Sequence, residues 1–172
     1  MATSASPKRG ATSARSASPG RSPDVVNNDY VLVSPVEAPA WRVYHDIRRR
    51  VLFEARGIPG YDEHRPDEQA AGHYPKLLLY RGDPVGVVRI DVAGTEAILR
   101  RVAIRADVQR RGHGRALVIL AARFARDHGC GRLASHVAPD AVEFYRKCGF
   151  LVEAAQPAEF SGHAPVFMTK PL

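Results

Sequence analysis

The sequence predicts a mixed α/β domain with one central sheet. Residues 76–92 hold two apolar runs joined by a Gly-Asp-Pro turn, the pattern of a β-hairpin. Residues 97–154 then alternate between strand-like and helix-like segments. The chain has 172 residues, enough for one domain with a substantial core. We therefore predict a single domain over residues 29–172.

The first 28 residues are predicted to be a disordered tail. They are rich in Ser, Ala, Pro, Gly and Arg and hold few side chains that could be buried. An organelle transit peptide is the alternative, but the Pro and Gly content argues against the amphipathic helix that such peptides form. Residues 1–23 contain no acid and carry four of the seven net positive charges, on Lys8, Arg9, Arg15 and Arg21. The folded part is only mildly basic, so the overall charge says little about its partners.

The first half of the domain is predicted to begin with a strand at 30–36. The next segment, 38–57, has apolar residues at three- and four-residue spacings, follows a proline and ends at glycine, which is typical of an amphipathic helix. Residues 58–75 form a long polar loop, a kind of segment that is usually functional or mobile.

The second half is predicted to be a meander followed by alternating helices and strands. The predicted strands are 76–80, 85–92, 97–104, 132–138, 150–154 and 165–172, and the predicted helices are 114–128 and 141–148.

Composition excludes several classes of protein. No apolar run approaches the roughly 20 residues of a membrane span. The two cysteines, Cys130 and Cys148, lack CxxC spacing, which argues against a disulfide framework and a cysteine-based zinc site. The histidines form no HExxH or HxH pattern. We expect a cytoplasmic protein with no metal and no membrane partner.

A glycine-rich junction, RADVQRRGHGR at 105–115, links the strand 97–104 directly to the next helix. It places unpaired backbone N–H groups at the positive end of a helix dipole. Gly112 and Gly114 lack Cβ, so an anion can approach the backbone, and Arg110, Arg111 and Arg115 add charge. The junction suits a diphosphate, although a plain turn is equally open from this pattern alone. Neither a Walker loop nor a GxGxxG fingerprint is present.

Nucleic acid is the alternative partner for these basic residues. Phosphates could be neutralised by Arg100, Arg101, Arg105, Arg110, Arg111 and Arg115. The segment lacks aromatic residues that stack on bases, and it matches no nucleic-acid-binding module. Strand alternation also predicts that Arg100 and Arg101 point to opposite faces. No nucleic-acid partner is expected.

Two motifs carry a family resemblance. QRRGHG at 109–114 resembles the Q/R-x-x-G-x-G/A signature of the GCN5-related N-acetyltransferases (GNAT), and AVEFYRKCGF at 141–150 resembles their A-x-x-F-Y-x-x-x-G-F motif. Their order and separation also match, as does the element order over 29–172. Residues 41–91 resemble small bacterial acetyltransferases of uncharacterised substrate. The chain departs from these at Val137-Ala138, in place of Ala-Gln, and at His163, five residues before Met168 rather than three.

The resemblance implies a mostly antiparallel central sheet flanked by helices in three α-β-α layers. It also implies acetyl-CoA as the acyl donor, direct attack by an amine, and no metal. The 109–115 loop would hold the pyrophosphate, and the strand before it would pair with the pantetheine arm, with one amide polarising the thioester carbonyl. The implied cofactor-binding residues are Val102, Ala103, Ile104, Gln109, Arg110, Arg111, Gly112, His113, Gly114 and Arg115.

The resemblance also places Tyr145 at the position of the general acid that protonates the leaving thiolate. A thiol has a pKa near 8.5 and a phenol about 10, so the transfer is uphill by roughly 1.5 pKa units unless the site lowers the phenol pKa. The helix pattern alone favours Tyr145 as a core residue. Glu96 and His136 are candidate bases, and each could equally be structural.

A cationic amine could instead be bound by His73 and the loop acids Asp62, Glu63, Asp67 and Glu68, which could equally be solvated. The implied function is acetyl-CoA-dependent N-acetylation of a primary amine on a small molecule or peptide. The alternative is a non-catalytic acetyl-CoA sensor or regulatory module of the same fold. A homodimer stays open as the quaternary state.

Overall fold

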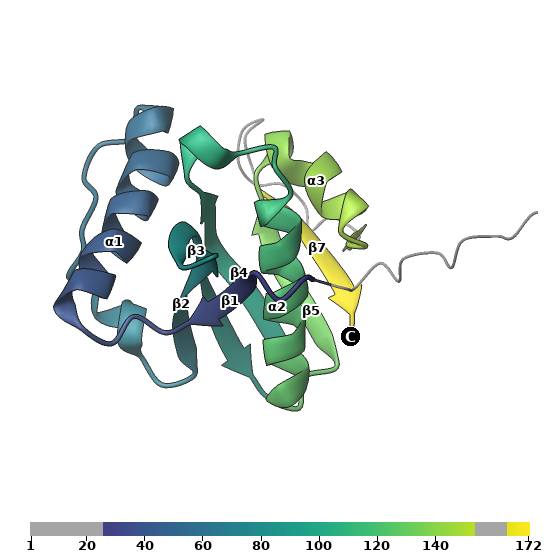
Figure 1. Cartoon of the computed structure of the whole chain (residues 1–172). Coiled ribbons are helices and arrows are strands. Elements are labelled where there is room, and N and C mark those ends of the chain that lie inside the picture. The colour runs from purple at the N-terminus through teal and green to yellow at the C-terminus, as the bar shows by residue number, and fades with distance from the viewer. Residues whose placement is uncertain (1–25, 154–164) are drawn as a thin grey trace, which may run out of the picture.

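The computed structural model describes residues 26–153 and 165–172. Its strands form one sheet in the order β1-β2-β3-β4-β5-β7-β6, antiparallel except for β4 with β5. Helix α1 covers one face of this sheet, and α2 and α3 cover the other (Figure 1). The predicted mixed, mostly antiparallel sheet in three α-β-α layers is thereby confirmed. Most of the predicted tail, residues 1–25, and His163 lie outside the described residues.

The N-terminal part consists of β1 (Tyr30–Val33) and α1 (Ala38–Arg48). The chain continues from α1 through a π-helical turn (Arg49–Phe53) and a 3₁₀ turn (Glu54–Arg56). This helical segment ends at Gly57, whose φ is 65°. The predicted helix 38–57 is therefore correct in extent, but its last two turns are not α-helical. A left-handed glycine of this kind commonly ends a helix.

Three long antiparallel strands follow: β2 (His73–Tyr80), β3 (Asp83–Ala93) and β4 (Glu96–Ile104). Strand β2 begins three residues before the predicted strand because Tyr74 pairs with Ile90 across the sheet. The 58–75 loop is correspondingly shorter, and it contains a 3₁₀ turn at Pro66–Gln69.

The C-terminal half contains α2 (His113–Asp127), β5 (Arg132–Val137) and α3 (Val142–Lys147). The last strands are β6 (Leu151–Val152) and β7 (Val166–Pro171), and β7 lies between β5 and β6. This half follows the predicted order of elements.

The parallel strands β4 and β5 pair over four residue pairs, ending at Leu99 with Ser135. Both strands run further, but the pairing of β4 with β3 shifts register between Val87 and Arg89. Arg101 on β4, beside this shift, has a φ of 56°. A β-bulge bends its strand and increases the local twist. Beyond Leu99, β4 therefore turns away from β5, and a gap opens between the two strands.

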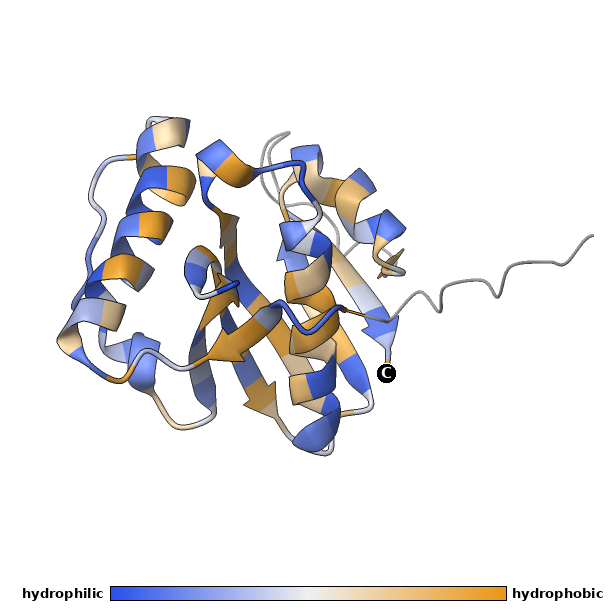
Figure 2. Cartoon of the chain, viewed as in Figure 1, coloured by the Kyte–Doolittle hydropathy of each residue, from blue (hydrophilic) through white to orange (hydrophobic). Residues whose placement is uncertain are grey.

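Two apolar clusters pack on the two faces of the sheet. The larger cluster lies under α2 and α3 and includes Leu99, Leu117, Leu133 and Phe150. The smaller one, with Tyr44 and Ile47 at its centre, lies under α1. In Figure 2 the hydrophobic colouring gathers on the central strands and on α2. Full burial of such a side chain contributes about 1.5–3 kcal/mol, so α2 is the better anchored helix.

Candidate active site

The start of α2 presents open backbone donors. Its N-cap is Gly112, with a φ of 90° and no side-chain capping hydrogen bond, and its first turn holds no acid. The first helical hydrogen bond runs from the Ala116 N–H to the Gly112 carbonyl at 3.1 Å, so the N–H groups before Ala116 have no helical partner. A Cβ built on Gly112 would meet no atom within 4 Å. The positive end of the helix therefore faces open space.

Side chains of the preceding loop hold this helix start against the end of β4. The Gln109 amide donates to the Ile104 carbonyl at 2.9 Å. Arg105 binds both carboxylate oxygens of Asp107 at 2.8 Å and donates to the Pro84 carbonyl at 3.1 Å. Both side chains fix the loop from within, so the loop has a defined shape before any ligand binds.

The two glycines of the loop, Gly112 and Gly114, have different surroundings. A Cβ on Gly114 would lie 3.1 and 3.2 Å from atoms of the Phe144 ring, which belongs to α3. The space beside Gly114 is therefore filled by an aromatic ring, and this glycine lets α2 and α3 approach closely. Sequence reasoning gave both glycines to an approaching anion, and only Gly112 has the open space for it.

The His113 side chain turns away from the loop. Its Nδ1 atom lies 2.9 Å from the Tyr30 hydroxyl on β1, and the ring packs against Tyr80. Burial lowers the pKa of His113, and the positive charges of Arg111 and Arg105 lower it further. The imidazole is therefore neutral near pH 7, and only the backbone of His113 belongs to the loop.

The gap exposes one backbone edge of β4. The Arg105 N–H donates to Val85 on β3, so by the two-residue alternation the polar groups of Ile104 face the other edge. Among the described residues no strand pairs with that edge beyond Leu99. The predicted pantetheine-binding residues Val102 to Ile104 thus lie where an extended ligand could add to the sheet.

Tyr145 lies at the point where the strands part. It is 5% exposed, and its ring packs edge-on against Phe144 and Phe150. The phenol hydrogen-bonds to Ser135, whose hydroxyl donates to the Leu99 carbonyl at 3.2 Å. Burial raises the pKa of Tyr145, and the Ser135 hydrogen bond offsets part of that rise. Tyr145 is therefore a core residue whose hydroxyl sits at the base of the gap.

The two candidate bases lie in different places. Glu96 begins β4, about 26 Å along the strand from Ile104, and it pairs with Arg132. His136 follows Ser135 on β5 and packs against Phe167, with ring centroids 4.9 Å apart. Burial, and after it the charge of Arg100, lowers the pKa of His136. The structure brings His136 to the gap and leaves Glu96 at the far end.

The α1 face of the sheet holds a buried ionic network that sequence reasoning missed. Arg48 pairs with Glu68 at 2.6 Å, and the Tyr44 hydroxyl donates to the same carboxylate at 2.6 Å. Arg89 binds Asp91 at 2.8 and 3.0 Å and Asp67 at 2.8 Å. The members come from three segments that are separate in the sequence, α1, the 58–75 loop and β3, so no local motif identifies them.

This network changes the interpretation of the loop acids. Burial would raise the pKa of Glu68, but hydrogen bonds from Tyr44 and Arg48 outweigh it and leave the pKa below its ordinary value. The hydrogen bond from Arg89 lowers the pKa of Asp67. Both acids are ionised and already neutralised by arginines. Their ion pairs with Arg48 and Arg89 anchor the 58–75 loop, so their charge is already balanced within the protein.

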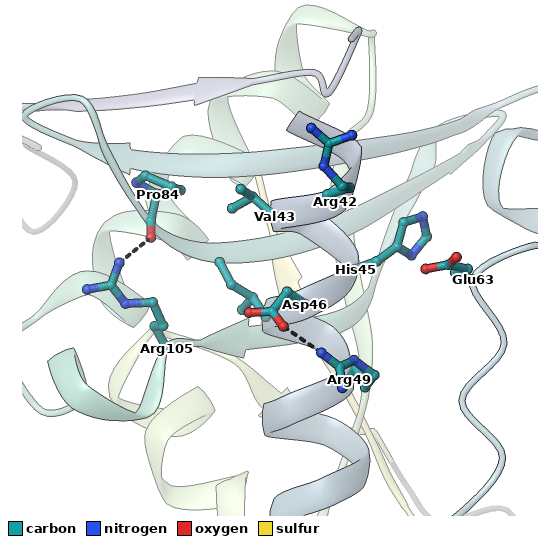
Figure 3. Close-up of a pocket in the computed structure, with 9 residues that line it drawn as sticks. Arg42, Val43, His45, Asp46, Arg49, Glu63, Pro84 and Arg105 are labelled. Atoms are coloured by element: carbon teal, nitrogen blue, oxygen red, sulfur yellow. Dashed lines mark hydrogen bonds and ion pairs between the residues drawn. The ribbon is translucent and has the colours of Figure 1, made fainter. Parts of the chain in front are cut away.

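A hollow of about 550 Å³ lies beside α1 (Figure 3). Arg42, His45 and Asp46 line it from the helix, and Pro84 and Arg105 line it from the opposite side. Since Arg105 directly follows β4, this hollow reaches from α1 to the end of β4. Within the described ranges no group of three or more His, Cys, Asp or Glu could hold a metal ion. In the same ranges no helix combines the length and hydrophobicity needed to cross a membrane.

The parted parallel strands and the glycine-capped helix between them define an acyltransferase fold. The profile described as "Acetyltransferase (GNAT) family" matches residues 41–150. The chain belongs to this family and is an acyltransferase.

Solved structures agree with this assignment. A Lactobacillus plantarum protein assigned as an N-acetyltransferase is 26% identical, with a TM-score of 0.70 over 84% of this chain and 99% of that one. The ribosomal-protein-S18-alanine N-acetyltransferase of Escherichia coli is 20% identical, with a TM-score of 0.65 over 83% and 93%. The PaiA N-acetyltransferase of Thermoplasma acidophilum, solved with coenzyme A, is 14% identical, with a TM-score of 0.66 over 83% and 99%. The last two comparisons support the fold alone.

Proposed function

We propose that this protein is an acetyl-CoA-dependent N-acetyltransferase that acts on a primary amine of a small molecule or peptide. The observation that carries the proposal is the gap between β4 and β5. The open start of α2 lies beyond one end of this gap, and the Tyr145 hydroxyl, through Ser135, lies at the other. A diphosphate, an extended arm and a leaving thiolate are the three parts of acetyl-CoA that such a site would accommodate.

The pyrophosphate would bind the amides of residues 110–115. These donors lie at a helix start whose first turn holds no acid, and Gly112 leaves room for the phosphate oxygens. Arg110 and Arg111 are exposed there and add positive charge. The Gln109 side chain and the His113 ring make hydrogen bonds to other parts of the protein and hold the loop in position.

The pantetheine arm would pair with the free edge of β4 at Val102 to Ile104, as an added strand does. A backbone N–H on this edge would then donate to the thioester oxygen. That oxygen becomes an oxyanion when the amine attacks, so a fixed donor stabilises the transition state more than the ground state.

The transfer itself would be direct. The amine nitrogen forms a bond to the acetyl carbon, the C–S bond breaks, and the electron pair leaves with sulfur. Tyr145 would give its proton to the thiolate, and the neutral His136 imidazole would take the proton that the amine loses. Because burial raises the pKa of Tyr145, its proton transfer is driven by the negative charge that develops on sulfur.

Release of free thiol from acetyl-CoA tests the function. The protein is mixed with acetyl-CoA and a panel of primary amines, and coenzyme A is measured with a thiol reagent. We expect amine-dependent release. Binding of coenzyme A in calorimetry without release for any amine would favour the acetyl-CoA sensor instead.

Gly112→Asp tests the cofactor site. A carboxylate at the open helix start would repel the pyrophosphate, so we expect an affinity loss of more than about 100-fold, as a charge-assisted anion site would show. Gly129→Asp is the matched control. Gly129 also has a positive φ and open space around it, but it lies at the other end of α2. Equal acetyl-CoA affinities in the two variants would refute the assignment.

A further inference from the structure

Arg101 has an unusual backbone conformation at the β4 bulge. Its φ is 56°, in the left-handed region, which a residue with a side chain adopts at a cost that glycine does not have. Strain of this kind persists when the surroundings enforce it, and it clusters at functional sites.

The Arg101 guanidinium also lacks partners. Its Nε atom is buried without a hydrogen-bond acceptor, and among the described residues the side chain makes no hydrogen bond or ion pair. The other arginines of this region do: Arg48 pairs with Glu68, Arg89 with Asp91, and Arg100 with Asp91. Arg101 is half-buried, and withdrawing a cation from water without a counter-charge is costly. Within residues 26–153 and 165–172, its Nε donor therefore has no acceptor.

The side chain faces the α1 side of the sheet. Burial lowers its pKa, the charges of Arg48 on α1, Arg65 in the loop and Arg89 on β3 lower it further, and the Glu68 carboxylate raises it. Arg100 contacts Asp91 on this same side. The prediction that Arg100 and Arg101 point to opposite faces is therefore wrong, because the bulge adds a residue and breaks the alternation.

Charges do not balance within the cluster formed by Arg101 and the ion-paired groups around Arg89. In this cluster five guanidinium groups meet three carboxylates, which leaves two positive charges in excess. The guanidinium groups are those of Arg48, Arg65, Arg89, Arg100 and Arg101, and the carboxylates are those of Asp67, Glu68 and Asp91. Such a surplus beside an unpaired donor is complementary to an anion.

The position of Arg101 points to the acceptor rather than to the cofactor. It lies two residues beyond the last β4–β5 pair, at the level of the gap, whereas the helix start and Tyr145 belong to the opposite face. With acetyl-CoA entering from the α2 side, the amine must reach the thioester from the α1 side. Arg101 is then beside the incoming acceptor.

We propose that Arg101 binds an anionic group, a carboxylate or a phosphate, carried by the amine acceptor. This inference rests on the proposed function and deepens it by naming the substrate class. Amino acids and phosphorylated amino sugars have the required chemistry, and polyamines do not. The surplus positive charge also favours the neutral form of the bound amine, which is the form that attacks.

Matched pairs of acceptors test the charge requirement. Thiol release is measured for amino acids against their C-terminal amides, and for glucosamine 6-phosphate against glucosamine, with spermidine as a polycation. We expect kcat/KM to be at least about 10-fold higher for the anionic member of one pair, the ratio of one good charge-assisted hydrogen bond. The preferred pair distinguishes a carboxylate from a phosphate.

Substitutions at Arg101 test the residue. For the anionic acceptor we expect R101Q to raise KM and lower kcat/KM by about 100-fold, and R101K to recover part of the loss. The neutral partner should react equally well with R101Q and with the native protein. R126Q, which removes an exposed charge on α2, is the control and should behave as the native protein.

Stability gives a second readout. R101G removes both the strain and the unpaired charge, so its melting temperature should rise by about 2–4 °C. R81G relieves a similar φ of 51° at an exposed turn residue that is ion-paired with Asp29, and it should gain less.

The outcomes separate the two proposals. Turnover with no preference within any pair, or with R101Q unaffected, overturns the anion subsite and leaves the acetyltransferase standing. If no amine is turned over, thermal shifts of the coenzyme A complex with the same compounds decide. Stabilisation by anionic amines in the native protein but not in R101Q supports the subsite alone, and no stabilisation overturns it.

Discussion

The two faces of the sheet are built by different physical means. Under α2 and α3 the contacts are apolar, and the polar elements of the site are backbone groups: the helix start at Gly112 and the free edge of β4. Under α1 the apolar cluster is small, and paired side-chain charges hold the loop to the sheet. In the proposed function the backbone donors would bind the acyl donor, which is the same in every reaction, whereas side-chain charges can differ between proteins to suit one acceptor. The difference separates a general half of the site from a specific one.

The largest effect is expected from breaking the α1 face. Glu68→Ala leaves the buried Arg48 guanidinium without its counter-charge, and such a loss destabilises by about 3–5 kcal/mol. Urea unfolding measures it. Glu63→Ala, an exposed acid of the same loop, is the control and should change stability by less than about 0.5 kcal/mol. Equal effects would mean that charge pairing does not hold this face.

The pH dependence of unfolding sharpens the same test. The pKa of Glu68 is below its ordinary value, so its stabilising contribution is complete above about pH 4.3. It is lost as the pH falls through the lowered value of the folded state. Glu68→Gln should lack this component of acid destabilisation, while Glu63→Gln should keep it.

The next effect concerns the general half of the site. For Tyr145→Phe we expect kcat to fall about 100-fold, the lower range for a general acid, with acetyl-CoA affinity unchanged. Steady-state kinetics and calorimetry measure the two quantities. Tyr74→Phe removes a phenol hydroxyl that lies beside Phe124 and His128, away from the gap, and should leave kcat as it is. Undiminished turnover of Tyr145→Phe would leave Tyr145 only its packing role.

The smallest effect tests the contact of α2 with α3. In Gly114→Ala the new methyl group is too close to the Phe144 ring, which lowers the free energy of unfolding by about 1–3 kcal/mol. The better helix propensity of alanine raises it by about 1 kcal/mol. We expect a net loss near 1 kcal/mol in thermal unfolding. Adding Phe144→Leu should restore part of it. Gly131→Ala, with open space and ordinary φ, should cost nothing comparable.

The parts of the general half are local in the sequence, so sequence patterns could propose them, and their binding and catalytic roles stay predictions. Gly112 and the helix it opens are adjacent in the chain, and Tyr145 belongs to one short motif. The packing of Gly114 against Phe144 was not foreseen, because Phe144 is 30 residues away in the sequence.

The specific half could not be predicted in this way. Each member of the Arg48–Glu68 and Arg89–Asp91 pairs looks like an ordinary surface charge until the sheet buries it. The bulge at Arg101 depends on a register between two strands, and residue alternation gave the wrong face. Glu96 was a candidate base because its strand leads to the glycine-rich loop. The residue begins that strand, however, and therefore lies far from the gap.

The short pairing of β4 with β5 has a thermodynamic consequence for the protein in the cell. The two halves of the sheet are joined by only four β4–β5 residue pairs, so much of the boundary between these strands has no hydrogen bonds in the ligand-free protein. We call this boundary the seam. A ligand that occupies this seam binds the folded state and not the unfolded one, and mass action then ties resistance to heat and proteolysis to its concentration. With acetyl-CoA as the proposed ligand, the lifetime of the protein would rise and fall with the cellular concentration of acetyl-CoA.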